Sequence, residues 1–326
     1  MDELQQHASI VLADFSGAEA GAISHCTASA ITVSVAALIS KGESNNIAQL
    51  PDTTGLMDKV IIFKDHVVNF GHSILQSIRL SGATPIIVNN NEDYLYSLAD
   101  KKVCGVLLVS SKLSGCQFLD FKTVIKLAHK QRKPVIIDAA AQDFRLKELI
   151  NLDADLILVS AQKYLAAPTA GLIFGKSRYI AAVRKQESGI GRGMKPTKEA
   201  IAGVLAAIEE RKQLDITNWV EEQHIKNKTL LDELKDLKGL DCRLESDPTG
   251  LPFNRVNIIV NNKLLGLSAE ELSYALRNST PSIWINDQNA KQAILQLELP
   301  LLELEEVKLL CKVMKNIIYL HHGSKW

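Results

Sequence analysis

Asp138 and Lys163 are the two residues of this sequence whose types and spacing most directly suggest chemistry. Asp138 follows the apolar run Val135–Ile137, and a second apolar run, Leu156–Val159, is followed by Ser160 and then by the lysine. Apolar runs of this length that are rich in β-branched residues are typical of strands buried in a parallel sheet. Because open α/β sheets bind ligands at the carboxyl ends of their strands, we expect the carboxylate and the amine at one binding edge.

This pair of groups suits pyridoxal phosphate. The cofactor needs a lysine amine to hold its aldehyde as a Schiff base, and an acid opposite its pyridine nitrogen to keep that nitrogen protonated. Lys163 and Asp138 are the candidates for these roles, and the hydroxyl of Ser160 is a candidate contact for the cofactor phosphate. The same pattern is also typical of a parallel strand that ends in a capping aspartate with an exposed lysine beyond it, and the pattern alone leaves both interpretations open.

A second candidate phosphate contact lies near the start of the chain. Small and hydroxylated residues over Ser24–Ala30 open a strongly apolar helix that extends to about Ile39. The first backbone N–H groups of a helix have no partner within the helix and lie at the positive end of its dipole. We therefore expect Cys26, Thr27 and Ala28 to bind the phosphate, although a simple cap on a core helix would have the same sequence.

His66 is the candidate for contact with the cofactor ring. It follows the expected strand Val60–Phe63, at the same sheet edge as Asp138 and Lys163, and its imidazole can stack on a pyridine face. A lone histidine after a strand is also common as a polar residue satisfied by its surroundings. Both interpretations stay open.

Two loops supply the candidates for substrate binding. The segment Ser188–Pro196 has three glycines and two basic residues, Arg192 and Lys195, and a guanidinium matches the geometry of phosphate or carboxylate groups. The segment 50–56 offers polar side chains that can contact sugar hydroxyls or a neighbouring subunit, or simply form a turn. These side chains are Asp52, Thr53 and Thr54.

Strand-like and helix-like segments alternate along the first two thirds of the chain. Expected strands besides the central pair lie at 60–63, 85–88, 104–109 and 171–175, and expected helices at 2–15, 28–39, 70–81, 92–99, 118–130, 177–186 and from 198 to about 237, kinked near 215–218. Strands separated by helices require crossover connections and therefore form a parallel sheet. We predict an α/β fold, a three-layer sandwich with a mainly parallel sheet, over residues 1–215.

The remaining residues, 216–326, are expected to form a small α+β domain with an antiparallel sheet. Its expected strands are Asp241–Glu245, Asn254–Val260, Ser282–Ile285 and Ala293–Leu297. In the large domain, residues 16–21 are expected to form a turn and residues 42–50 a polar loop, because both segments are rich in small or polar residues.

The composition limits the function classes. Of 326 residues, 37 are Lys or Arg and 37 are Asp or Glu, which gives a formal net charge of +0. This balance lacks the basic excess of nucleic-acid-binding proteins, so nucleic acid is not an expected partner. No apolar run approaches membrane-spanning length, and the N-terminus is acidic where a signal peptide would be basic. We expect a cytoplasmic protein with no membrane partner.

The cysteines point to the same compartment. They are odd in number, widely spread and without a CxxC pair, which is typical of reduced thiols. No spacing of His and Cys residues indicates a metal site, so no metal is expected. The five positions are Cys26, Cys104, Cys116, Cys242 and Cys311.

Several motifs resemble those of a known family. They are FSGAEAG (15–21), LPDTTG (50–55), VIIFKDH (60–66), VIIDAAA (135–141), LVSAQK (158–163), GIGRGMKPTKE (189–199) and LGLSAEEL (265–272). With them the chain resembles the fold-type-I pyridoxal-phosphate enzymes of the selenocysteine synthase group, and most closely the branch that includes D-glucosaminate-6-phosphate ammonia-lyase. The resemblance implies a transferase-like α/β fold, Lys163 as the Schiff-base lysine, Asp138 as the partner of the ring nitrogen and His66 near the ring. It also implies homodimers or larger homo-oligomers.

The activity that the resemblance implies is a lyase reaction. The expected reaction is α,β-elimination on an amino-sugar acid phosphate, which releases ammonia and leaves a 2-oxo acid. Two alternatives stay open: selenium transfer to seryl-tRNA, and a homologue that binds the cofactor without turnover. The second is motivated by departures from the family pattern, such as Ala166–Pro168, where a glycine-rich segment is expected, and the segments 284–287 and 297–300, where basic residues are expected.

Overall fold

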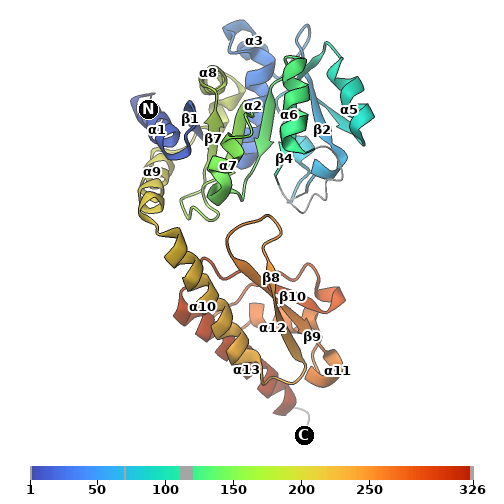
Figure 1. The fold of residues 1–326 in the computed structure, drawn as a ribbon, viewed down its shortest axis with the longest axis vertical. Coiled ribbons are helices and arrows are strands. Elements are labelled where there is room, and N and C mark those ends of the chain that lie inside the picture. The colour runs from blue at the N-terminus through green and yellow to red at the C-terminus, as the bar shows by residue number, and fades with distance from the viewer. Residues whose placement is uncertain (1, 70, 111–119, 324–326) are drawn as a thin grey trace. The chain divides into compact units, whose positions relative to one another are not determined.

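The computed structural model describes residues 2–69, 71–110 and 120–323. The chain folds into two compact units, Met1–Gln213 and Leu214–Trp326 (Figure 1). Each unit has its own apolar core and is described by itself.

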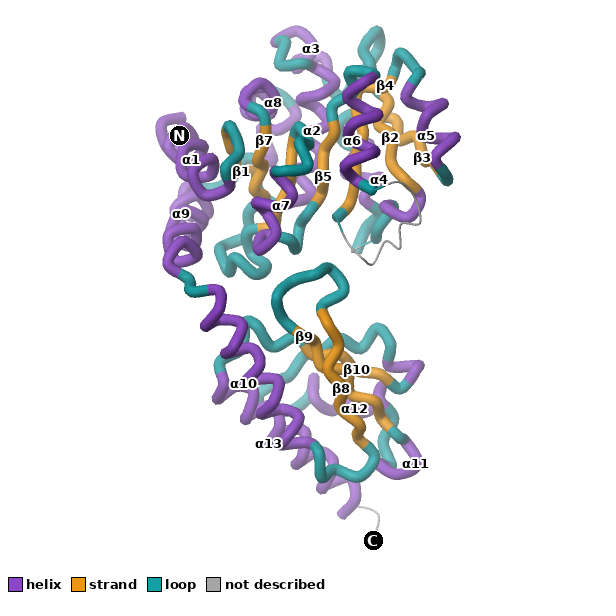
Figure 2. The backbone as a smooth tube through the Cα atoms, in the orientation of Figure 1, coloured by secondary structure: helices purple, strands orange, loops and turns teal. Residues whose placement is uncertain are grey.

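The first unit is built on a seven-stranded sheet in the order β1-β7-β6-β5-β4-β2-β3, drawn in orange in Figure 2. The strands β6, β5, β4, β2 and β3 are parallel to one another, and β7 is antiparallel to both β6 and β1. The strands are β1 (Ala20–Ser24), β2 (Lys59–Phe63), β3 (Thr84–Val88), β4 (Val103–Val109), β5 (Val135–Asp138), β6 (Leu156–Ser160) and β7 (Gly171–Gly175). The prediction of a mainly parallel α/β sheet is confirmed.

Helices cover both faces of this sheet, so the unit has three layers. One core cluster joins the sheet to α1, α5, α6, α7 and α9, and the other joins it to α2, α4 and α8. All seven residues of β4 are buried, as expected for a strand covered on both faces. The helices are α1 (Asp2–Ser16), α2 (Thr27–Ser40), α3 (Ser44–Gln49), α4 (Ile74–Arg79), α5 (Asn91–Leu98), α6 (Phe121–Lys130), α7 (Leu146–Ile150), α8 (Ser177–Lys185) and α9 (Lys198–Gln213).

Three local predictions for the first unit were wrong. Residues 20–21 belong to strand β1 and not to a turn, because Ala20–Ser24 pairs with β7 over five residues. The expected polar loop 42–50 contains the short helix α3. The expected long helix is two helices, since Asp215 accepts N–H bonds from Thr217 and Asn218 and so caps a new helix, α10 (Ile216–Leu234).

The second unit has a three-stranded sheet in the order β10-β9-β8, and the prediction that this sheet is antiparallel is confirmed. Its strands are β8 (Leu240–Ser246), β9 (Asn254–Val260) and β10 (Ile294–Leu297), and its other helices are α11 (Asn262–Leu265), α12 (Ala269–Arg277) and α13 (Leu304–Gly323). The expected strand Ser282–Ile285 does not form. Its residues have no ladder partner among the described strands, and instead the Ser282 hydroxyl bonds the carbonyl of Arg277 while Trp284 packs on that guanidinium.

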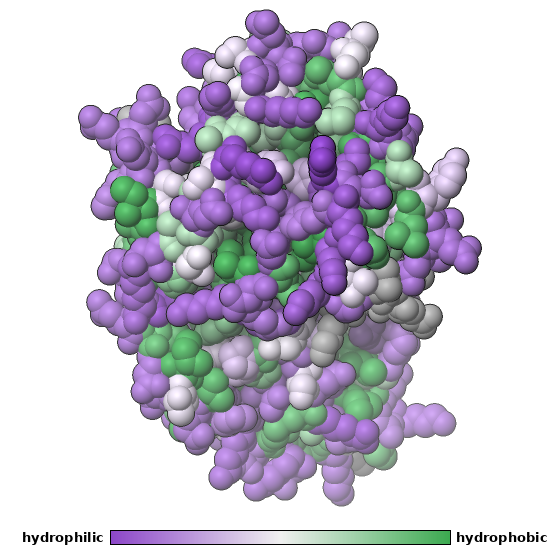
Figure 3. Space-filling model, turned by 45° about the horizontal axis from the view of Figure 1, so that its top comes forward, coloured by the Kyte–Doolittle hydropathy of each residue, from purple (hydrophilic) through white to green (hydrophobic). Residues whose placement is uncertain are grey.

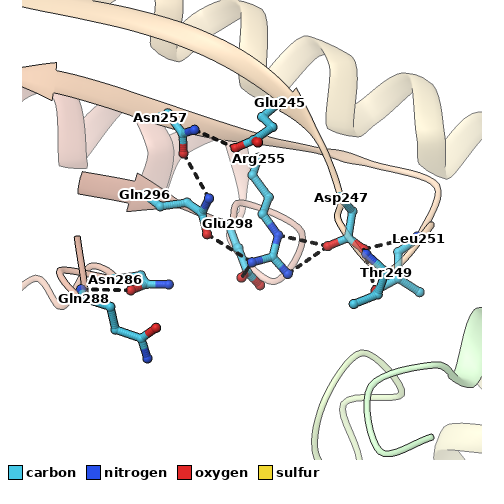
Figure 4. Close-up of polar contacts among 10 residues, drawn as sticks. All are labelled: Glu245, Asp247, Thr249, Leu251, Arg255, Asn257, Asn286, Gln288, Gln296 and Glu298. Atoms are coloured by element: carbon cyan, nitrogen blue, oxygen red, sulfur yellow. Dashed lines mark hydrogen bonds and ion pairs between the residues drawn. The ribbon is translucent and has the colours of Figure 1, made fainter. Parts of the chain in front are cut away.

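A buried polar cluster lies on this small sheet (Figure 4). The guanidinium of Arg255 contacts Asp247 Oδ2 through Nε at 2.9 Å and Nη2 at 2.8 Å, and its Nη1 contacts Gln296 at 3.0 Å and Glu298 at 2.7 Å. Asp247 Oδ1 also accepts the hydroxyl of Thr249 at 2.5 Å and the N–H of Leu251 at 3.2 Å. We call these residues, Asp247, Thr249, Leu251, Arg255, Gln296 and Glu298, the Arg255 cluster.

The hydrophilic surface is consistent with the many charged residues in the sequence. On the face shown in Figure 3, hydrophilic side chains predominate and hydrophobic ones form small groups between them. Among the described residues no helix is both long and apolar enough to cross a membrane. The described cysteines Cys26, Cys104, Cys242 and Cys311 form no disulfide, and Cys116 lies outside the described residues.

Candidate active site

A cavity of about 280 Å³ lies at the carboxyl end of the parallel strands of the first unit. The six residues that the sequence predicted to contact the phosphate, the ring nitrogen or the aldehyde of the cofactor all line it. These residues are Cys26, Thr27, Ala28, Asp138, Ser160 and Lys163. Residues more than a hundred positions apart in the sequence therefore meet at one cavity.

The sheet topology explains this convergence. Asp138 and Ser160 end the neighbouring parallel strands β5 and β6. Ser24 ends β1, which is antiparallel to β7 and so runs in the same direction as β6. The chain therefore leaves β1 at the same edge and enters α2 there. A side chain at Gly171 on β7 would have its Cβ only 2.4 Å from the carbonyl of Cys26, so glycine is needed for this approach.

The first turn of α2 forms one wall of the cavity. Cys26 precedes the helix in an extended conformation, its N–H donates to the hydroxyl of Ser29 at 2.9 Å, and that hydroxyl donates to the Cys26 carbonyl at 2.7 Å. The free N–H groups of a first turn, at the positive end of a fourteen-residue helix, form a site that favours an anion. Thr27 and Ala28 are in this turn and line the cavity.

Asp138 is a buried carboxyl group with few partners. Its Oδ1 accepts the N–H of Ala140 at 3.2 Å, and among the described residues no other hydrogen bond to this side chain is formed. Burial raises the pKa of Asp138 to about 6, against the opposing effects of the Ala140 N–H and the Lys163 charge. A buried acid with a raised pKa that lines a cavity is typical of a functional site.

Lys163 is in a tight loop between β6 and β7. Its carbonyl accepts the N–H of Ala166 at 3.0 Å, and the N–H of Ala167 bonds the carbonyl of Ala161, also at 3.0 Å. Ala166 has a φ of 55°, in the left-handed region that favours glycine. The loop thus adopts the backbone expected of a glycine-rich segment although the sequence has alanine there.

His66 does not line the cavity. It is buried, its Nδ1 accepts the N–H of Val109 at 3.3 Å, and its ring meets the edges of Phe63 and Phe121. Burial lowers the pKa of His66 to about 4, so the imidazole is neutral at physiological pH. Its contact with the cofactor ring stays a prediction.

Sequence reasoning missed another histidine. His72 is exposed and lines the cavity, and its Nε2 lies 3.2 Å from the hydroxyl of Ser77, which also lines it. No strand end or motif marked either residue, since His72 precedes the short helix α4 and Ser77 is inside it. Gln162, directly before the lysine, is a third polar residue of the lining that was not predicted.

The predicted substrate contacts do not line this cavity. Lys195 pairs with Glu187 at 3.1 Å, and Arg192 is exposed. Asp52 Oδ1 accepts the N–H and the hydroxyl of Thr54, and Thr53 donates to Asp58, so these residues form a turn. Their contact with a substrate stays a prediction. Among the described residues, no three His, Cys, Asp or Glu side chains come together as a metal site.

Comparisons with known proteins agree with this architecture. A family model described as beta-eliminating lyase matches residues 117–250. D-glucosaminate-6-phosphate ammonia lyase of Salmonella typhimurium is 28% identical over 303 residues, which are 91% of this chain and 81% of that protein. L-seryl-tRNA(Sec) selenium transferase of Aquifex aeolicus is 28% identical over 188 residues, 49% of this chain and 41% of that protein.

A solved structure of D-glucosaminate-6-phosphate ammonia-lyase covers 98% of this chain and 87% of its own, with a TM-score of 0.87 and 27% identity. The sequence and the fold thus point to the same relatives. The resemblance that the motifs indicated is confirmed: the chain is similar to the beta-eliminating lyase family model over residues 117–250 and to D-glucosaminate-6-phosphate ammonia-lyase over nearly its whole length.

Proposed function

We propose that this protein is a pyridoxal-phosphate-dependent ammonia-lyase that acts on a phosphorylated amino-sugar acid. The observation that carries the proposal is one cavity lined by a buried acid, a lysine and the first turn of a long helix. The similarity to D-glucosaminate-6-phosphate ammonia-lyase over 91% of the chain supports the reaction class.

The cavity fits the cofactor in three respects. The N–H groups at the start of α2 suit a phosphate, and Ser160, which carries a hydroxyl, lines the same cavity. The pKa of Asp138 is raised because burial outweighs the Ala140 N–H and the Lys163 charge, and a protonated pyridine nitrogen would stabilise this carboxylate further. Lys163 completes the set with a primary amine for the aldehyde.

In the proposed elimination each of these side chains has its own role. When bound, pyridoxal phosphate supplies an electron sink for the pair left on the substrate α-carbon. Lys163 Nζ takes the α-proton, and Asp138 holds the proton on the ring nitrogen. The β-hydroxyl leaves as water, and hydrolysis of the enamine product gives a 2-oxo acid and ammonia. The leaving hydroxyl therefore still needs a proton donor.

His72 is our candidate for the proton that the leaving hydroxyl needs. It is exposed to the cavity, and Ser77 contacts its Nε2. His66, with its pKa lowered by burial and its Nδ1 engaged by Val109, is less suited to move a proton. A comparison of His72→Gln with His66→Gln distinguishes them, because only the first is expected to lower kcat without loss of stability.

We also propose a homo-oligomer, because the resemblance to the fold-type-I enzymes implies active sites shared between subunits. Asp52, Thr53, Thr54, Arg192 and Lys195 do not line the cavity of their own chain, and a neighbouring subunit could present some of them. Mixing Lys163→Ala protein with Arg192→Ala protein tests this, because shared sites would restore activity in the mixture. A monomer by light scattering would exclude it.

The seryl-tRNA reaction is the less favoured alternative. The selenium transferase matches about half of this chain, and the equal numbers of basic and acidic residues give no general attraction to RNA.

Absorbance and ammonia release test the proposal. The purified protein should show a visible absorption band that Lys163→Ala abolishes, and turnover of a phosphorylated amino-sugar acid should fall by about 1000-fold or more in that variant. Lys126→Ala, on the exposed face of α6, is the matched control. A visible band without ammonia release from any such substrate would favour a homologue that binds the cofactor without turnover. Absence of the band would contradict the proposal that the protein binds pyridoxal phosphate.

A further inference from the structure

A single arginine joins the two segments that carry Asp138 and Lys163. Arg211 is in the last turn of α9, and its Nη1 lies 2.6 Å from Asp143 Oδ2. Its Nη2 donates to the backbone carbonyl of Tyr164. Asp143 is five positions after the acid of β5, and Tyr164 directly follows the lysine.

The arginine is held firmly enough to act as a brace. Its side chain is only 10% exposed, and its guanidinium lies over the ring of Phe144, 4.0 Å from the ring centroid. The helix that carries it is anchored in the core by fully buried residues, Ile201, Val204 and Ile208. A planar guanidinium can hold two acceptors at fixed directions, which an ammonium cannot do.

The lysine loop is also held by short-range backbone bonds and by Leu165 and Ala167, which are buried in the apolar core. Ala166 bonds back to Lys163, and Ala167 to Ala161, so these bonds fix the shape of the loop but not its position relative to β5. The bond from Arg211 to Tyr164 ties the loop to the segment after Asp138 through Asp143, in addition to the backbone bond from the Ser160 N–H to the Ala140 carbonyl at the end of β6.

We propose that Arg211 is a positioning residue that sets the lysine loop against the segment of Asp138. It touches neither substrate nor cofactor and acts through the Tyr164 carbonyl and the Asp143 carboxylate. The consequence for catalysis rests on the proposed function, but the consequence for the loop does not. A shift of about 1 Å in a catalytic group can cost about 100-fold in rate.

Amide hydrogen exchange of the cofactor-free protein tests the brace. In Arg211→Met the amides of Ala166 and Ala167 should exchange about tenfold faster or more, because their loop loses its link to α9. Amides of β4 should keep their wild-type rates. Arg211→Lys should give an intermediate increase, since an ammonium keeps the charge but does not hold two acceptors in fixed directions. This variant carries the test if the methionine variant does not fold.

Lys212→Gln is the matched control. It is the next residue on the same helix and removes the same charge, but its partners are the exposed Asp14 and Glu209. Its exchange rates at Ala166 and Ala167 should equal those of the wild type. Wild-type rates at these amides in both Arg211 variants would overturn the proposal. So would a uniform increase over the whole first unit, because that pattern indicates a purely structural role.

A spectroscopic readout separates this proposal from the proposed function. In protein that shows the visible cofactor band, Arg211→Met should shift the pH titration of the band and lower kcat by about 100-fold with KM changed little. Arg211→Lys should restore part of both. If the wild type shows no band, the proposed function fails while the exchange result still decides the role of Arg211.

Discussion

Two buried aspartates of this protein, Asp138 in the cavity and Asp247 in the Arg255 cluster, have opposite surroundings. Both are at least nine-tenths buried. Asp138 accepts one backbone N–H, and its pKa is raised to about 6 by burial. Burial also acts to raise the pKa of Asp247, but the Thr249 hydroxyl, the N–H groups of Leu251 and Thr249 and the guanidinium of Arg255 outweigh it, so this pKa lies below its usual value.

This difference in pKa distinguishes Asp138, a carboxyl group available to a ligand, from Asp247, a carboxylate that stabilises the fold. In the Arg255 cluster the chain supplies the partners that a buried carboxylate needs, so the cluster is complete when the chain folds. In the cavity the carboxylate is buried without such partners, which costs stability until a ligand provides them. The comparison predicts that mutations in the two regions act in opposite directions.

The largest effect is expected in the Arg255 cluster. Arg255→Met leaves Asp247 buried without its counter-charge and should lower the free energy of unfolding of the second unit by about 3 kcal/mol. The sequence places its three tryptophans, Trp219, Trp284 and Trp326, in the second unit, so tryptophan fluorescence in urea reports the unfolding of that unit.

Arg243→Met is the control for this prediction. It removes an arginine from the same sheet that also pairs with an aspartate, Asp241, but there both partners are exposed. An exposed pair contributes about 0.2–1 kcal/mol. Equal losses in the two variants would contradict the distinction between a complete buried cluster and an ordinary surface pair.

An intermediate effect of opposite sign is expected at Asp138. In cofactor-free protein Asp138→Asn should raise the free energy of unfolding at pH 8 by about 1–3 kcal/mol, because it removes a charge that burial disfavours. The folded pKa is above the unfolded value of 3.8, so the wild type loses stability as the pH rises from about 4 to about 6. The gain should therefore be small at pH 4 and constant above pH 7, as calorimetry can measure.

Asp247→Asn sharpens this second prediction. The folded pKa of Asp247 is below its unfolded value, so this carboxylate stabilises the fold above that value and the stabilisation is lost as the pH falls. The same substitution should thus destabilise the second unit at pH 8 and have less effect at low pH. If Asp138→Asn and Asp247→Asn changed the free energy of unfolding at pH 8 in the same direction, the proposed difference between the two surroundings would be wrong.

The smallest effects are expected at two alanines with a left-handed backbone, one in each unit. Ala166 in the lysine loop has a φ of 55° and Ala293, before β10, a φ of 62°. Glycine relieves this strain, but it also gives the unfolded chain more conformational entropy. Each Ala→Gly variant should therefore raise the free energy of unfolding by about 0.5 kcal/mol or less. Calorimetry for the first unit and tryptophan fluorescence for the second can measure it. A loss above about 1 kcal/mol at either position would contradict a strained alanine there.

The sequence was sufficient for the parts of the site that depend on strand ends. Val135–Ile137 and Leu156–Val159 were recognisable as buried parallel strands, and parallel strands bring their carboxyl ends to one edge whatever the details of packing. Asp138, Ser160 and Lys163 therefore line one cavity, as that reasoning requires.

The parts that the sequence could not place depend on side-chain direction and on distant partners. His66 follows β2 at the expected edge, but its ring turns into the core against Phe63, and periodicity does not report this direction. Lys195 has a pattern typical of an anion contact, yet Glu187 from the preceding turn neutralises it. Arg211 could not be selected from the sequence, since nothing local links it to a carbonyl 47 residues earlier.

The pairing of β1 with β7 also limits when the cavity can form during synthesis. Ser24 of β1 lies opposite Gly171 of β7, 147 residues later, and β7 is the strand next to β1 in the sheet. At about 5–20 residues per second the ribosome needs on the order of ten seconds to make the connecting chain. Until then the start of α2 cannot be fixed beside β6. A nascent chain that ends before β7 should therefore be unable to retain the cofactor phosphate, even with Lys163 already made.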